Sequence, residues 1–304
     1  VRVAATYGYE HFLDDVGAFN KDPINSASGG GANPSGESQI GGAFSQTRFS
    51  YGMFDLITGL RYDTYKLDGT FTAQAGNPLG LPLDQEEGRF NPKVTLAAQV
   101  LPWLQPYVTY AEAFRAPTVN ETMLGGSHPG GGTAGFAPNP FLEPEVQKGW
   151  EFGANIRQDR IFTRSDSFRM KAAYFDMNVE NYISACITTG FYFCNATGTS
   201  QVRGVELEGM YDAGFVFAGL TYTFTDTNLP SQVNGAGAHS FLPEHTVVAT
   251  GGMRFLDQKL TVGGRVSYFS ESYVGDVNVG GFYAFPYMPG YTLVDLFTSY
   301  KFDS

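Results

Sequence analysis

The chain has 304 residues, only 16% of them are charged, and the formal net charge is −11. An acidic chain of this kind argues against nucleic acid as a partner, because phosphate binding needs a basic surface. No apolar segment reaches the ~20 residues that a membrane-spanning helix needs. The 38 glycines, 26 phenylalanines and 18 tyrosines are instead typical of an all-β protein with many turns.

Alternation of apolar and polar residues predicts the strands. Leu220, Tyr222 and Phe224, for example, alternate with threonines that occupy the opposite side of the same segment. Twelve segments of this kind follow one another along the chain, at residues 1–10, 38–50, 55–67, 90–100, 104–114, 147–158, 168–180, 200–212, 215–226, 245–256, 260–271 and 291–302.

The connections between these segments alternate in length. Tight connections are expected at 51–54, 101–103, 159–167, 213–214 and 257–259, and long ones at 11–37, 68–89, 115–146, 181–199, 227–244 and 272–290. In an up-and-down sheet this alternation places all long loops at one end, as in outer-membrane barrels. A soluble β-sandwich explains the strands but not the loop lengths. We therefore predict an all-β, antiparallel up-and-down transmembrane β-barrel in contact with outer-membrane lipid.

The connection from Phe114 to Leu142 is the first candidate for function, because so long a loop without predicted secondary structure is unusual. It contains one histidine, His128, whose glycine- and proline-rich flanks offer no core for the imidazole. An imidazole on an exposed loop is suited to be an axial ligand of haem iron. Met123, Phe136 and Phe141 are candidates to cover the porphyrin faces, although loop aromatics also serve loop packing.

His239 lies in another long connection and is a second candidate for contact with haem or with a haem-carrying protein. His11 and His245 are expected at the rim of the barrel. Cys186 and Cys194 do not have the spacing or the number of a zinc site. A local disulfide is the preferred interpretation and requires an oxidising compartment. Two free thiols are the alternative.

No arrangement of catalytic residues is recognisable. The histidines have no obvious strand-borne serine partner, and neither a Walker-type glycine loop nor an HExxH motif is present. Glu206 and Glu208 are expected on the polar face of a strand, where a solvated lumen accounts for them. We predict that the protein is not an enzyme and has no catalytic cofactor.

Two motifs border the loop that contains His128. Phe114, Arg115, Ala116 and Pro117 open it, and Asn139, Pro140, Phe141 and Leu142 close it. This pair resembles the FRAP and NPNL boxes of TonB-dependent outer-membrane haem receptors, with Phe141 where the family pattern has Asn. Other segments resemble barrel strands of the same receptors, at Gly59–Leu67, Phe90–Thr118, Glu143–Gly153 and Val202–Gly209.

The resemblance implies a 22-stranded barrel occluded by an N-terminal plug in the outer membrane of a Gram-negative bacterium. It implies that haem, free or carried by a haemoprotein or haemophore, is the transported ligand and that the TonB complex supplies the energy. His128 would coordinate the haem iron. Arg115 would either pair with a haem propionate or form a structural ion pair at the barrel rim. Pro117 and Pro140 would stiffen the two ends of the loop.

On the same resemblance, residues 1–304 are part of the C-terminal β-barrel domain, and the plug domain and the closing strands are not present. The first residues read as the middle of a strand, so we expect a part of a longer protein. Two alternatives stay open. One is a TonB-dependent receptor for a ferric siderophore or cobalamin, in which His128 is incidental, and the other is a passive porin or adhesin barrel.

Overall fold

The computed structural model describes residues 1–17, 36–70, 82–127, 135–187, 191–229, 242–273 and 287–302. Twelve long strands form one sheet. They are β1 (Arg2–Val16), β2 (Gly36–Tyr51), β3 (Phe54–Thr70), β4 (Pro82–Ala98), β5 (Leu104–Arg115), β8 (Glu145–Asp159), β9 (Ser167–Glu180), β12 (Thr199–Asp212), β13 (Val216–Thr227), β14 (His245–Phe255), β15 (Leu260–Phe269) and β18 (Tyr291–Tyr300).

The smaller elements lie in the connections between these strands. They are α1 (Val119–Met123), β6 (Gly126–Ser127), β7 (Gly135–Phe136), β10 (Ile183–Ile187), β11 (Phe191–Asn195), β16 (Ser272–Tyr273) and β17 (Tyr287–Met288). Strands β10, β11, β7 and β6 form a second sheet in that order, and β16 pairs with β17. Within the described ranges, no helix has both the length and the apolar character to span a membrane.

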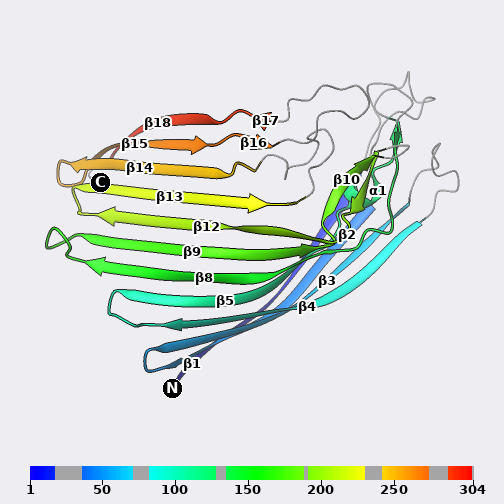
Figure 1. Ribbon diagram of the computed structural model, residues 1–304, viewed down its shortest axis with the longest axis horizontal. Helices are drawn as coiled ribbons and strands as arrows, with labels where there is room; N and C mark the ends of the chain where they lie inside the picture. Colours follow the sequence, from blue (N-terminus) through cyan, green and yellow to red (C-terminus); the bar gives the residue numbers. More distant parts are fainter. Residues whose placement is uncertain are drawn as a thin grey trace.

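The large sheet confirms the predicted topology. Its strands follow one another in chain order from β1 to β18, and each is antiparallel to its neighbours. The sheet is curved, with β1 and β18 at its two edges (Figure 1). The tight connections lie at one end, and two of them contain glycines in the left-handed region, Gly52 (φ 57°) and Gly214 (φ 85°).

The predicted strand boundaries are least accurate at the end where the long connections leave. Strand β1 continues to Val16, and β4 begins at Pro82 rather than at residue 90. Residues 83–89 carry charges on both faces, so alternation could not reveal the strand. Backbone pairing with β3 nevertheless continues over this stretch. On the opposite part of β3, Lys66 and Asp68 form an ion pair at 2.6 Å.

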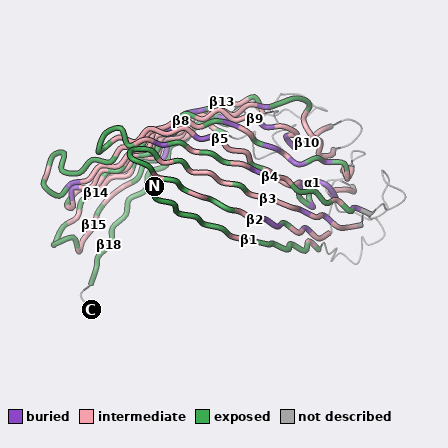
Figure 2. Tube along the Cα trace, turned by 90° about the horizontal axis from the view of Figure 1, so that it is seen from below, coloured by how far each residue is buried: buried purple, intermediate pink, exposed green. Residues whose placement is uncertain are grey.

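One face of the large sheet is an exposed apolar belt. Leu220 of β13 lies in register between Gly209 of β12 and Ala249 of β14, and side chains of the same parity continue the face to both edges. Exposed apolar residues of the belt include Val3, Tyr7, Phe49, Leu56, Leu60, Val94, Leu96, Phe152, Leu220, Met253, Val262, Val266, Val294 and Leu296. A belt of this extent on one face is the arrangement of a barrel wall in lipid. Figure 2 shows how widely exposed residues are distributed over the edge strands.

The opposite face carries charges in pairs. Ion pairs join Arg48 to Asp55 at 2.6 Å, Lys171 to Glu151 at 3.1 Å and Arg254 to Asp212 at 2.8 Å. Glu206 and Glu208 share this face, since Glu208 is in register with Lys171. The polar lumen face expected from the sequence is therefore present.

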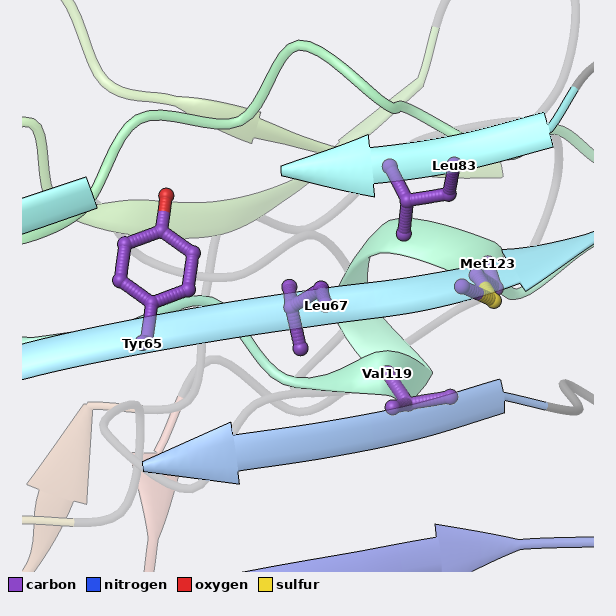
Figure 3. Packing of buried hydrophobic residues seen from close by; sticks show 5 residues of the cluster. All are labelled: Tyr65, Leu67, Leu83, Val119 and Met123. Atoms are coloured by element: carbon purple, nitrogen blue, oxygen red, sulfur yellow. The ribbon is translucent and has the colours of Figure 1, made fainter. Parts of the chain in front are cut away.

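The connection between β5 and β8 folds back onto the large sheet. Its helix α1 contributes Val119 and Met123 to a buried cluster with Tyr65, Leu67 and Leu83 from β3 and β4 (Figure 3). Val16, Phe114 and Ala116 pack against this cluster. Burial of each apolar side chain of this size stabilises the fold by roughly 1.5–3 kcal/mol. The first part of the loop is therefore fixed to the barrel.

We expect the two faces to respond oppositely to a new charge. Leu220→Lys places an ammonium in the middle of the apolar belt and should lower the free energy of unfolding by about 2–4 kcal/mol. Thr221→Lys, the adjacent residue on the lumen face, is the matched control and should cost much less. The measurement is unfolding of the protein in phospholipid vesicles. Equal losses in the two variants would show that the belt does not face lipid.

Candidate functional site: the loop between β5 and β8

The two ends of the loop are joined by an ion pair. Arg115, the last residue of β5, is in register with Glu145, the first residue of β8. The guanidinium Nη2 lies 2.6 Å from Glu145 Oε1, and Nε lies 2.7 Å from Oε2. This bidentate geometry is the strongest form of an arginine–carboxylate contact, because it fixes both distance and orientation.

The same guanidinium also holds the start of helix α1. Its Nη1 and Nη2 donate to the carboxylate of Glu121 at 3.0 and 3.1 Å. Glu121 and Thr118 form a capping box, in which the Thr118 amide donates to Glu121 Oε2 at 2.9 Å and the Glu121 amide donates to Thr118 Oγ1 at 3.2 Å. Burial lowers the pKa of Arg115, but hydrogen bonds to Glu145 and Glu121 outweigh it and raise the pKa above its ordinary value.

Two roles were predicted for Arg115, a pair with a haem propionate and a structural ion pair at the barrel rim. The structural ion pair at the rim is present, with two carboxylates on one guanidinium. Met123 is likewise placed within the protein, only 5% exposed, in the cluster below α1. Contact of Arg115 or Met123 with haem stays a prediction.

The loop has secondary structure of its own, so the prediction of a loop without it is wrong. The capping box starts α1, and this signal, Thr118-x-x-Glu121, is legible in the sequence. Strands β6 and β7 pair with each other through Gly126 and Phe136, and β7 pairs in parallel with β11 of the next loop. That second pairing is non-local, and no local pattern reveals it.

The residues of the first motif fix the departure of the chain. Phe114 lies against Tyr65, with 5.8 Å between ring centroids. Pro117 is fully buried, and Ala116 packs on the cluster that contains Val119. The proline therefore fixes its backbone angle at a fully buried position next to Ala116.

The second motif fixes the return. The Asn139 amide donates to Thr122 O at 2.9 Å, and its side-chain Nδ2 donates to Phe193 O at 2.8 Å. Asn139 Oδ1 accepts from the Phe141 amide at 3.1 Å, and Pro140 O accepts from Gln85 Nε2. Leu142 is 2% exposed whereas Phe141 is 83% exposed. The departure from the NPNL pattern thus falls on a side chain that points outward and leaves the anchor intact.

The candidate histidines fall into two groups. His128 and His239 lie outside the described residues, although the sequence places His128 directly after Ser127 of β6. His245 begins β14, with its Nδ1 3.0 Å from the Tyr222 hydroxyl, and its ring lies against Tyr222 and Phe224. Phe136, another haem candidate, belongs to β7 and is partly buried.

The predicted disulfide is confirmed. Cys186 of β10 and Cys194 of β11 are bonded, with 6.0 Å between their Cα atoms. Four residues that hold the loop by hydrogen bonds were not predicted from the sequence, namely Glu121, Glu145, Gln85 and Asn195. In the part of the chain that the structure describes, no group of three or more His, Cys, Asp or Glu residues could hold a metal ion.

Comparison with known proteins adds three kinds of similarity. The family model described as "TonB dependent receptor-like, beta-barrel" matches residues 2–304. A probable TonB-dependent receptor of Haemophilus influenzae is 26% identical over 79% of this chain and 30% of its own length. A hemin receptor of Yersinia enterocolitica is 30% identical over 56% of the chain and 26% of the relative. The chain thus spans less than a third of either relative.

Among solved structures, similarity is high to a double mutant of the Serratia marcescens hemophore receptor HasR in complex with its hemophore HasA and heme. The TM-score is 0.76 at 27% identity, and the match covers 99% of this chain and 51% of that one.

We expect Asn139→Ala to loosen the return of the loop. The variant loses the hydrogen bonds to Phe193 and to the Phe141 amide, each worth roughly 0.5–1.5 kcal/mol. Hydrogen–deuterium exchange should therefore accelerate in residues 137–142 and 192–195. Asn120→Ala, at an exposed position of α1, is the matched control and should leave both segments protected. Unchanged exchange in Asn139→Ala would show that this side chain does not anchor the loop.

The cluster below α1 contains one titratable group with a shifted pKa, the phenol of Tyr65. Burial raises the pKa of Tyr65 to about 12 from 10.0, and the negative charge of Glu87 acts in the same direction. Because the fold favours the neutral phenol, the stability it contributes is complete below pH 10 and is lost as the pH rises through 12. The difference in tyrosinate absorbance between wild type and Tyr65→Phe should have its midpoint near 12. A midpoint near 10 would mean that the cluster is open to water.

Proposed function

Because this chain belongs to the TonB-dependent receptor β-barrel family, we propose that it is the loop-bearing part of an outer-membrane receptor that binds haem and imports it with energy supplied through TonB. Receptors of this family transport their ligands and are not a class of enzymes. Their barrels lie in the outer membrane of Gram-negative bacteria, and we propose the same location and lipid surroundings for this protein.

The observation that carries the proposal is the use of the two motifs as anchors. Arg115 joins both ends of the loop, and Asn139 ties its return to α1 and to β11. Strands β6 and β7 then pair, so Ser127 and Gly135 are neighbours, and the chain between them contains His128. An imidazole at this position is a suitable axial ligand for haem iron.

The named relatives support haem as the transported ligand. One is a hemin receptor, and the similar solved structure is a hemophore receptor in complex with heme. Haem here is cargo and not a catalytic cofactor. Its source, whether free haem, a haemoprotein or a haemophore, and its delivery through the TonB complex are part of the same proposal.

The proposed sequence of events begins with capture of the haem iron by His128 on the outer side. Haem then passes to a plug domain outside residues 1–304, which supplies the contact with TonB. Passage follows the lumen face of the sheet, where paired charges such as Arg48–Asp55 and Lys171–Glu151 keep the wall polar. The iron–imidazole coordination bond forms on capture and breaks on transfer, while no bond within the porphyrin changes. His239 is a proposed second contact.

Haem titration of the complete receptor tests the proposal. We expect His128→Ala to alter the Soret band of the saturated complex and to weaken haem binding. Removing a residue that only hydrogen-bonds a metal ligand weakens metal binding roughly 10- to 100-fold, so the loss here should be at least as large. His11→Ala, on edge strand β1, is the matched control and should bind haem as the wild type does.

Three other results would change the assignment. Binding unaffected by His128→Ala removes this residue from the site, and a loss in His239→Ala instead moves the ligand to that loop. Failure of the wild type to bind haem overturns the proposed cargo and favours a ferric siderophore or cobalamin.

A further inference from the structure

The hairpin of β10 and β11 belongs to the connection between β9 and β12, yet it contacts the His128 loop at β7 and at the return segment that contains Asn139 and Glu143. Figure 1 shows β10 and α1 at the same end of the large sheet. Strand β11 pairs with β10 on one side and with β7 on the other, which gives the order β10-β11-β7-β6. The hairpin therefore forms half of the sheet whose other half borders His128.

Strands β6 and β7 need this support. Each has two residues, and an isolated two-stranded hairpin is at best marginally stable in water even when it is longer. The parallel pairing of Phe136 with Phe191 adds the backbone of β11 as a third strand. The register of β6 and β7, and with it the place where the chain enters and leaves the segment that contains His128, depends on β11.

Side chains reinforce the same contact near the return of the loop. Asn139 Nδ2 donates to Phe193 O of β11 at 2.8 Å. Asn195 accepts from the Glu143 amide through Oδ1 at 2.8 Å and donates to Glu143 O through Nδ2 at 2.8 Å. These two hydrogen bonds imitate a backbone pair, so Asn195 extends β11 alongside the loop.

The first strand of the hairpin is connected to the anchor as well. The Ile183 amide of β10 donates to Glu145 Oε1 at 2.9 Å, and this oxygen also accepts from Arg115. The hairpin thus contacts the β7 strand, the return segment at Asn139 and Glu143, and the ion pair that joins the loop ends. The first two contacts come from β11 and the third from β10, so all three exist together only while the two strands stay paired.

The disulfide keeps them together. Each strand has five residues, too short for a hairpin to persist in water by itself. Cys186 and Cys194 bond across the pair, which removes open states from the ensemble of the loop. Asn195 Nδ2 adds a hydrogen bond to Asn181 O at 2.7 Å at the base of the hairpin.

We propose that the disulfide-closed hairpin of β10 and β11 is the platform that holds Ser127 and Gly135, the two ends of the segment that contains His128, for haem binding, with Cys186, Cys194 and Asn195 as positioning residues. This inference rests on the proposed function. It makes the affinity for haem depend on the disulfide between Cys186 and Cys194, which lies in a different loop from His128, the proposed iron ligand. Opening the platform lowers the fraction of receptor in which His128 is correctly placed, and the apparent dissociation constant rises by the same factor.

The test is a double-mutant cycle in the complete receptor. The variant Cys186→Ser/Cys194→Ser should raise the dissociation constant for haem about tenfold, as expected when the competent fraction falls to about one tenth. The spectrum of the saturated complex should remain that of the wild type, because the iron ligand is still present. In a His128→Ala background the same cysteine changes should have no further effect.

Two measurements keep the result interpretable. Heat-modifiable migration on gels establishes that the barrel of each variant is folded. Asn195→Ala, which keeps the disulfide, should weaken haem binding in the same direction and accelerate hydrogen exchange in residues 126–127 and 135–136. Wild-type affinity in the double-cysteine variant overturns the platform. An equal loss in the His128→Ala background overturns it too, because the hairpin would then act elsewhere.

Failure of the proposed function gives a different pattern. If His128→Ala binds haem as the wild type does, the ligand assignment fails, and hydrogen exchange alone decides the structural part. Faster exchange of β6 and β7 in the double-cysteine variant supports the platform, and unchanged exchange contradicts it.

Discussion

The ion pair between Arg115 and Glu145 is the contact on which the candidate site depends. It connects the last residue of β5 to the first residue of β8, and through Glu121 it holds the first turn of α1. Through Glu145 it also reaches the backbone of β10. Exposed ion pairs contribute little by themselves, and the Arg115 side chain is 41% exposed. The contribution here is geometric, because one planar guanidinium fixes the relative orientation of four elements.

The large sheet makes such an anchor useful. In lipid every backbone amide and carbonyl must be paired, so the strands continue without interruption and recognition is confined to the loops beyond them. Side chains alternate between an apolar belt and a lumen with paired charges, and the long connections lie beyond both. The connection between β5 and β8 is fixed at its ends by the buried cluster at Leu67 and by the ion pair at Arg115.

Sequence reasoning recovered what is periodic and missed what is non-local. The twelve strands follow from the alternation of apolar and polar residues, and the end of the sheet that carries the loops follows from the alternation of long and short connections. The alternation of apolar and polar residues extends over the bilayer and fails beyond it, as the charged start of β4 shows. The motif boundaries and the disulfide were also predictable. Helix α1 could have been found, because Thr118 and Glu121 have the capping spacing. The partner of Arg115 lies 30 positions away, and the pairing of β7 with β11 joins different loops, so no local pattern contains either.

The structure also separates two kinds of information in the loop. A barrel fold is shared by receptors with different cargoes, so strands can establish the family but not the ligand. Within the motifs, Arg115, Pro117, Asn139 and Leu142 contact other parts of the protein, and their spacing describes how a loop is fastened. Phe141 shows the consequence, since its side chain points outward and its identity can change without loss of the anchor. What selects the cargo must then be the residues that the anchors present, and our proposal assigns this role to His128, because imidazole is a suitable ligand for haem iron.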